Sequence, residues 1–172
     1  LPMSIDYSLA TFDVPSAGIS VPGRLSFVSP GQVNVQVPWE LQGRTSAQVK
    51  VVIRDSYGNV ITVPLADYAP AFFETSAGIA AALDANNNVV TTANAVERGK
   101  AVQLFLNGLG PVTNPPATGE PALASPLSET TTTPVVTIGG VNCPVLWSGL
   151  TPTLPGLYQI NVRLPEGLGT GT

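Results

Sequence analysis

The reactive side chains of this 172-residue chain limit the reactions that it could catalyse, because it contains no histidine and one cysteine. Without imidazole, Ser-His-Asp and Cys-His catalysis and histidine-ligated metal sites are excluded. The eleven carboxylates lie in predicted turns or at strand ends without local pairing, so glycoside hydrolysis would need two of them brought together from distant positions. We therefore predict that the protein is not an enzyme and binds no cofactor or metal.

The single cysteine, Cys143, precedes a proline in a predicted strand. We predict that it is a small buried apolar residue, because neither histidine nor a cationic cluster is present to activate the thiol. A reactive thiol is the alternative.

Residues 84–88 read Asp-Ala-Asn-Asn-Asn and match the first half of an EF-hand loop. The segment lacks the glycine at position six and the glutamate at position twelve that complete such a loop. Since asparagine tolerates positive φ, we predict a hairpin turn, with calcium binding as the alternative.

Amide side chains recur at matching positions in two related segments. Gln32 and Asn34 alternate with valines in the first segment, and Gln159 and Asn161 alternate with aliphatic residues in the second. Outward amides on a strand hydrogen bond to the backbone or to one another across the ladder. We predict a structural role for these four residues, and a ligand or interface role is the alternative.

Two tryptophans are suited to stacking on a sugar. Trp39 follows Pro38 at the end of a predicted strand, so it is the better candidate for an exposed ring. Trp147 lies within an apolar strand and is predicted to be in the core. The alternative is a sugar-stacking platform formed by Trp39 and Trp147 together with Tyr158.

The two segments that carry the amides are variants of one sequence, residues 30–38 and residues 155–165, with two residues inserted after the glycine in the second. In each, apolar and polar residues alternate with the period of a half-buried strand, and each ends at a proline, which cannot donate to a ladder. The spacing of about 125 residues favours two modules over a solenoid of many repeats.

Composition predicts an all-β fold. Only 10% of the residues are charged, and the 17 glycines and 17 prolines are frequent enough to supply turns between many short strands. We predict two β-sandwich modules in tandem, residues 1–72 and 99–172, joined by a connecting hairpin and linker at residues 73–98. Tight reversals are expected at residues 55–59 and at Gly139-Gly140. Strands are expected at residues 7–14, 24–28, 32–37, 47–55, 59–65, 80–83, 100–107, 134–138, 141–148 and 158–164.

The charge of the chain argues against nucleic acid as a partner, and its prolines and glycines argue against a membrane span. The net charge of −4 provides no basic stripe for phosphates, so nucleic acid is not expected as a partner. Residues 130–161 carry no charge, but prolines and glycines interrupt them, so they are not expected to span a membrane.

Three motifs in order resemble a known family. They are residues 100–111, with Gln-Leu-Phe-Leu-Asn-Gly-Leu-Gly-Pro at their centre, residues 136–141, and the final Pro-Gly…Gln-Ile-Asn-Val-Arg-Leu-Pro strand. Together they resemble the Solibacter-type carboxy-terminal domain of secreted acidobacterial proteins, which is itself similar to the IPT/TIG immunoglobulin-like sandwiches. The resemblance covers residues 24–171. It implies extracellular or cell-surface immunoglobulin-like modules with no catalytic residues to transfer.

Each module departs from that family pattern. The first lacks a convincing counterpart of the opening strand at residues 100–107, and the second lacks the closing hairpin that residues 48–63 supply in the first. We therefore expect each module to be incomplete by one or more strands. A missing strand leaves an unpaired edge and an exposed part of the core, which proteins either avoid or use for binding.

The leading functional hypothesis is a non-enzymatic, extracellular structural or adhesive protein. It would associate with other copies or other extracellular domains by strand complementation, in a filament or surface assembly. The alternative is a carbohydrate-binding accessory module of a secreted enzyme that holds a polysaccharide through Trp39.

Overall fold

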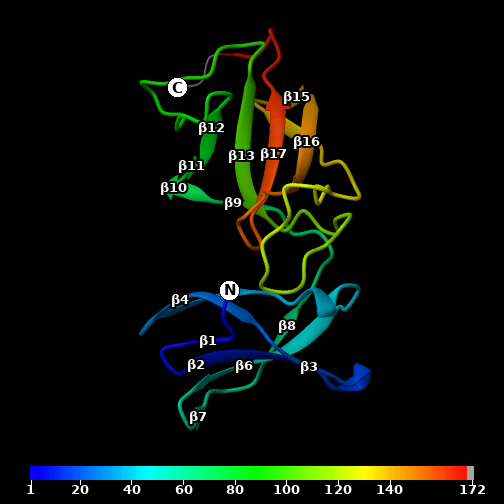
Figure 1. The fold of residues 1–172 in the computed structure, drawn as a ribbon. Coiled ribbons are helices and arrows are strands. Elements are labelled where there is room, and N and C mark those ends of the chain that lie inside the picture. The colour runs from blue at the N-terminus through cyan, green and yellow to red at the C-terminus, as the bar shows by residue number, and fades with distance from the viewer. Residues whose placement is uncertain (170–172) are drawn as a thin grey trace. The chain divides into compact units, whose positions relative to one another are not determined.

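A computed structural model describes residues 1–169 and shows an all-β protein (Figure 1). About 47% of the residues lie in strands, no helix reaches seven residues, and the sheets are antiparallel. The predicted all-β class is confirmed, and the arrangement is consistent with a β-sandwich.

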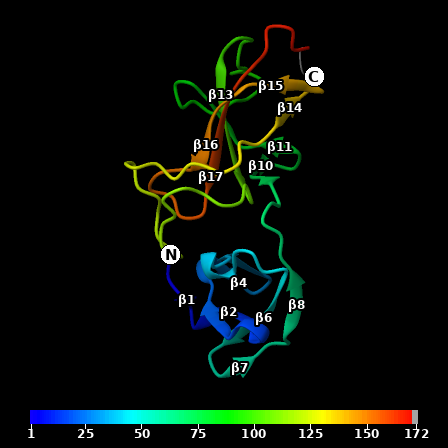
Figure 2. The same ribbon diagram turned by 90° about the vertical axis from the view of Figure 1, so that its right-hand side faces the viewer.

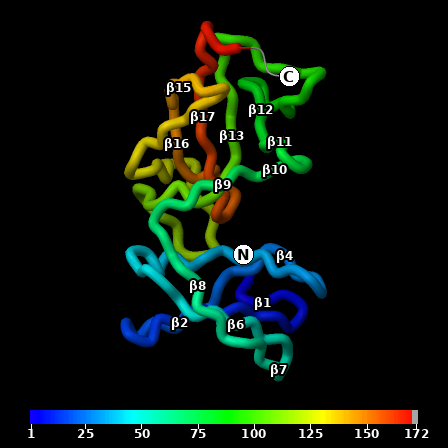
Figure 3. Tube along the Cα trace, turned by 180° about the vertical axis from the view of Figure 1, so that it is seen from behind, coloured from blue at the N-terminus to red at the C-terminus, as the bar shows by residue number. Residues whose placement is uncertain are grey.

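Contacts within the chain divide it into two compact units that do not follow chain order. Unit 1 contains Leu1–Asp67 and Pro116–Pro121, and unit 2 contains Tyr68–Pro115 and the described residues from Ala122 onward. Residues 73–98, which were expected as a connecting hairpin and linker, belong to unit 2 and contain three of its strands. The path of the chain from β8 into β9 can be followed in Figure 3.

Unit 1 contains two sheets. The larger has the order β1-β2-β6-β7, with β3 paired to β2 and β8 paired to β6, and the smaller contains β4 and β5. In Figure 2, β4 lies in a different layer from β2 and β6. The strands are β1 Ser4–Ile5, β2 Ser8–Val14, β3 Ile19–Pro22, β4 Arg24–Ser29, β5 Gln32–Gln36, β6 Ser46–Ile53, β7 Ser56–Tyr57 and β8 Ile61–Pro64, with short 3-10 turns at Pro15–Ala17 and Trp39–Leu41.

The core of unit 1 lies between its two layers. Phe12 and Val14 of β2 pack with the buried Leu41, and the half-buried Val35 of β5 packs against them. Gly23 lies at this contact, where a Cβ atom would meet a Phe12 ring carbon at 2.8 Å. The position therefore requires glycine for the layers to approach.

Unit 2 is built around a five-stranded sheet of order β12-β13-β17-β16, with β9 paired to β13. Figure 1 shows β13, β17 and β16 side by side. Two small hairpins, β10–β11 and β14–β15, complete the unit. The strands are β9 Ala71–Phe72, β10 Glu74–Ser76, β11 Ile79–Ala80, β12 Ala82–Asp84, β13 Ala101–Asn107, β14 Val136–Ile138, β15 Val141–Cys143, β16 Val145–Leu150 and β17 Tyr158–Arg163.

One face of the unit 2 sheet is buried. Leu106, Leu150, Ile160 and Val162 point to this face and are at most 2% exposed. Burial alternates strictly along β13 and β17, as period-2 patterning requires. Cys143 is also buried at 5% exposure, as predicted.

The hairpin turn expected at residues 55–59 begins one residue earlier, because Arg54 and Asp55 form a two-residue turn closed by the pair Ile53↔Ser56 of β6 and β7. β8 then pairs with β6 from Ser46↔Pro64 to Val49↔Ile61. The turn predicted at Gly139-Gly140 is present. Gly139 and Gly140 join β14 to β15 with φ of 56° and 77°, the left-handed geometry that such a two-residue turn demands.

The long polar loop after β13 sends residues 116–121 onto unit 1. The Gly119 N–H donates to Gln36 Oε1 at 3.1 Å, and the Trp39 N–H donates to Thr118 Oγ1 at 3.0 Å. The Thr118 hydroxyl in turn donates to Glu40 Oε2 at 2.7 Å. These contacts explain why a segment from the second half of the sequence belongs to unit 1.

Candidate functional site

The sequence repeat corresponds to a repeated hairpin with a bulge. In unit 1, β4 pairs with β5 so that Phe27 lies opposite Asn34 and Ser29 lies opposite Gln32. The register shifts between Leu25 and Phe27. The extra residue of a bulge changes the direction in which the following side chains point. Here the bulge places Phe27 opposite Asn34, so an aromatic residue lies beside an amide.

Unit 2 repeats this arrangement in β16 and β17. Trp147 lies opposite Asn161 and Gly149 lies opposite Gln159, with the register shift between Val145 and Trp147. The two hairpins therefore match in pairing, in the position of the bulge and in the position of the aromatic residue. They differ in the length of the connection between their strands.

The match continues beyond the second strand of each hairpin. The Leu41 N–H donates to the Pro38 carbonyl at 3.1 Å, and the Leu168 N–H donates to the Pro165 carbonyl at 3.1 Å. Both leucines are buried, at 3% and 9% exposure. The repeated structural element is thus a bulged hairpin followed by a proline turn.

The amides of each second strand bond to one another. Gln32 Nε2 donates to Asn34 Oδ1 at 2.6 Å in β5, and Gln159 Nε2 donates to Asn161 Oδ1 at 2.8 Å in β17. The side chains two residues apart lie on the same face of a strand, which explains the common pairing. The structure therefore brings together the predicted residues as two separate pairs, one in each unit.

The two copies differ at one edge. β17 pairs with β16 on one side and with β13 on the other, from Ala101↔Arg163 to Leu106↔Tyr158. β5 pairs with β4, and no other strand or bridge within residues 1–169 pairs with it. The open edge of β5 therefore corresponds to the edge that β13 fills in unit 2.

The open edge changes the burial of equivalent side chains. Val37 is 48% exposed, whereas Leu164, which precedes the proline in the other copy, is 9% exposed. The Leu164 backbone bonds to the chain leading into β13, through Lys100 O at 2.9 Å. Val33 and Val35 are only half-buried, while their counterparts in β17 are buried. Part of the apolar face of β5 is thus exposed.

The sequence of the open strand is symmetric. β5 reads Gln-Val-Asn-Val-Gln from Gln32 to Gln36 and carries no charge. Natural edge strands are commonly protected by charged side chains, prolines or bulges. Prolines lie at residues 30 and 38, outside the strand, so its own backbone groups remain available.

Trp39 belongs to neither amide pair. It begins the 3-10 turn after β5, is half-buried, and its indole Nε1 is buried without a hydrogen-bond partner among the described residues. The expected exposed ring is therefore not found at Trp39. Trp147, expected in the core, is instead half-buried and donates its indole N–H to Glu129 Oε1 at 3.3 Å. The bulge in β16 is the cause.

Asp84 closes the predicted asparagine turn. Its Oδ1 accepts the N–H groups of Asn86 and Asn88 at 2.8 and 2.9 Å, and its Oδ2 accepts amides from Asn88 and Asn94. The Asn88 backbone N–H, with these other donors, lowers the pKa of Asp84 below its ordinary value of 3.8. Both oxygens are therefore used in holding the turn, and the hairpin interpretation fits.

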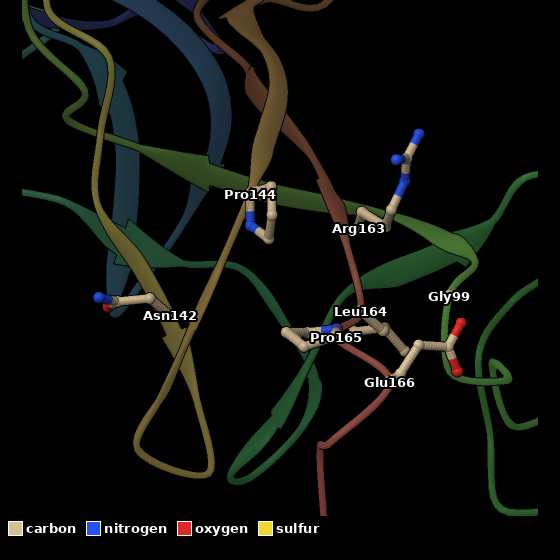
Figure 4. Close-up of a pocket in the computed structure, with 7 residues that line it drawn as sticks. All are labelled: Gly99, Asn142, Pro144, Arg163, Leu164, Pro165 and Glu166. Carbon is tan, nitrogen blue, oxygen red and sulfur yellow. The ribbon is translucent and has the colours of Figure 1, made fainter.

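A shallow cavity in unit 2 adjoins the end of β17 (Figure 4). Its ionisable residues are Arg163 and Glu166, whose side chains point in different directions. A Cβ at Gly99 would clash with the Glu166 carboxylate. The remaining lining residues are Asn142, Pro144, Leu164 and Pro165.

Within the described part of the chain, no three His, Cys, Asp or Glu residues gather as metal ligands. The same residues include no helix with the length and apolar character to cross a membrane. The chain matches no family model, no curated protein and no solved structure.

Proposed function

We propose that this is a non-enzymatic, extracellular structural or adhesive protein that associates with a second copy of itself through the open edge of β5. The supporting observation is the unpaired edge of β5 at the position where β17, its repeat, is paired with β13. The resemblance of the sequence to secreted immunoglobulin-like modules agrees with an extracellular location.

Unit 2 indicates what kind of strand fits such an edge. β13 is antiparallel to β17, places alternate apolar residues on the buried face, and presents Gln103 on the other. Gln159 Nε2 donates to Gln103 Oε1 at 2.9 Å across the pair. A suitable partner for β5 is therefore an uncharged alternating strand that presents amides outward.

β5 of a second copy meets this description. Antiparallel pairing about Asn34 places Asn34 opposite its own counterpart, Val33 opposite the partner's Val35, and Gln32 opposite the partner's Gln36. Every pair then joins like with like, apolar to apolar and amide to amide. This two-fold contact uses the same surface on both copies and closes on itself, so it makes dimers, and a filament would require another contact.

The energy of this contact favours reversible association. A five-residue strand adds a small number of interchain hydrogen bonds worth about 1 kcal/mol each. Partial burial of Val37 and the other valines adds roughly 1 kcal/mol per side chain. Lost translational and rotational freedom costs about 4–15 kcal/mol, so we expect a dimer that forms with rising concentration.

Sedimentation velocity over a concentration series tests the proposal. The parent chain should sediment as a monomer when dilute and as a dimer when concentrated. Asn34→Lys places two ammonium groups opposite one another at the dyad and should remain monomeric. Gln48→Lys is the matched control, because Gln48 is exposed on β6, whose two edges are already paired. A parent chain that stays monomeric at every concentration, or an equal effect of both substitutions, would contradict the proposal.

A further inference from the structure

The outward face of the unit 2 sheet carries an indole that lies along the sheet. A Cβ at Gly149 would come within 2.7 Å of Trp147 Cζ2 and 3.0 Å of Cη2, so the ring occupies the space above that glycine. Glu129 bridges to Gly149 at the neighbouring edge and accepts the indole N–H. The absence of a side chain at Gly149 leaves room for the indole over β16, and the Glu129 carboxylate fixes the ring by accepting its N–H.

A row of amides adjoins the ring. Gln159 Nε2 donates both to Asn161 Oδ1 and to Gln103 Oε1, at 2.8 and 2.9 Å. Gln103 Nε2 donates to Asn87 Oδ1 at 2.9 Å and to the Asp84 carbonyl at 3.0 Å. The row therefore spans β12, β13 and β17 and fixes the orientation of each amide.

Two polar atoms in this row have no hydrogen-bond partner among residues 1–169. Asn161 Nδ2 donates no bond, and Gln159 Oε1 accepts none. They belong to neighbouring outward side chains of β17. A donor and an acceptor side by side are the pair that a sugar hydroxyl or two adjacent hydroxyls can satisfy, since each hydroxyl both donates and accepts.

Aromatic residues also lie on the other side of the amides. Phe105 lies opposite Gln159 on β13, and the Phe73 N–H donates to the Phe105 carbonyl at 3.0 Å. Phe73 is 46% exposed. Phe105 and Gly149 lie opposite Gln159 on its two sides, so Phe105 and the glycine beneath the indole are about 9–10 Å apart across the sheet.

We propose that this face binds an extended, neutral polysaccharide that runs across the strands. Aromatic surface suits the apolar face of a pyranose ring, and the placed amides suit its hydroxyls. Glu129 and Arg163 lie at this face and are of opposite sign. The Asp84 carboxylate at the end of the amide row accepts hydrogen bonds from Asn86, Asn88 and Asn94, so no excess of positive charge favours an acidic polymer. Two aromatic contacts separated by two strand spacings require a ligand longer than a single sugar.

Isothermal titration tests this inference with cellohexaose, xylohexaose and mannohexaose as neutral probes, cellobiose as the short probe and polygalacturonate as the charged one. The titrations use the Asn34→Lys variant, so that the proposed dimer does not contribute. We expect at least one hexasaccharide to bind, cellobiose to bind at least tenfold more weakly than cellohexaose if that is the ligand, and polygalacturonate not to bind.

Two substitutions test the assigned residues. Trp147→Ala removes the ring, and Asn161→Asp removes the Nδ2 donor while it keeps the oxygen that accepts from Gln159; each should weaken binding at least tenfold. Tyr57→Ala is the control, because Tyr57 is 74% exposed on β7 in the other unit. Circular dichroism verifies that each variant is folded. Lack of binding to every neutral hexasaccharide, stronger binding of polygalacturonate, or unchanged affinity in the folded Asn161→Asp variant would overturn the inference.

Discussion

Replacing Gly149 by alanine puts a methyl group where unit 2 has no room for one. The new Cβ would lie 2.7 Å from Trp147 Cζ2 and would clash more closely with the Ser128 carbonyl oxygen. Carbon atoms pack best at about 3.5–4.0 Å, so the indole would have to move by roughly 1 Å. The Ser128 carbonyl accepts the Leu150 N–H at 2.8 Å, so movement of that oxygen costs a hydrogen bond.

The expected loss of stability follows from these two contacts. Overpacking of this kind costs about 1–3 kcal/mol, and the strained or broken hydrogen bond costs about 1 kcal/mol. The sum is about 2–4 kcal/mol of unfolding free energy. With a urea dependence of about 2 kcal/mol per molar, the midpoint of unfolding should fall by about 1–2 M.

Urea titration followed by Trp147 fluorescence measures this shift, in a Trp39→Phe background that removes the signal from unit 1. Gly167→Ala is the control, because a Cβ at Gly167 meets nothing within 4 Å, and it should change stability by less than about 0.5 kcal/mol. If the Gly149→Ala midpoint stays with that of the control, the close contact between glycine, indole and carbonyl is refuted.

Three other predictions follow from single contacts. Asp84→Asn should destabilise unit 2 more at pH 6 than at pH 3 in urea titrations. The hydrogen bond from the Asn88 backbone N–H is the main reason that the Asp84 pKa lies below 3.8. The stabilisation by the carboxylate is therefore present above the pKa of the unfolded chain and is lost as the pH falls through the pKa of the folded chain. Thr118→Val should lower the free energy of unfolding, measured by thermal denaturation, by about 1–3 kcal/mol, because the Trp39 N–H loses its acceptor. Cys143, at 5% exposure, should react with Ellman's reagent slowly in buffer and rapidly in urea, and rapid reaction of the folded chain would contradict its burial.

Alternating patterns and turn chemistry were enough to predict most strands. The valines of β5 and the aliphatic residues of β17 alternate with polar residues, and their strands lie within a residue or two of the expected bounds. Gly139-Gly140 was sufficient for a hairpin because few residues adopt positive φ at both central positions. Local backbone preference governs these features, so they can be read from a short window.

The placement of residues 116–121 could not be predicted in this way. The segment is polar and has no apolar period, and its position depends on hydrogen bonds such as that from Gly119 to Gln36, which lie 83 residues apart in the chain. Alternation along one strand carries no information about such pairings. The division of the chain into units therefore departs from a simple cut in the sequence.

The position of Trp147 was predicted wrongly for a different physical reason. Val145 and Leu146 precede it and Leu150 follows, so the run reads as uniformly apolar. A bulge between Val145 and Trp147 shifts the alternation and turns the indole to the outward face. Gly149, two residues later on the same face, is the feature of the sequence that indicates an outward indole, because a large ring that lies along a strand needs a small neighbour.

Disulfide cross-linking at the dyad tests the central proposal most directly. Antiparallel pairing of β5 about Asn34 brings the two Cβ atoms at this position to about 4.5–5.5 Å, close enough for a disulfide with slight adjustment. Gln32 would lie opposite the partner's Gln36 and not opposite its own counterpart. We therefore expect Asn34→Cys to form a covalent dimer under mild oxidation and Gln32→Cys to remain monomeric, with the native Cys143 buried in both. Equal cross-linking of the two variants, or none in either, would contradict the account.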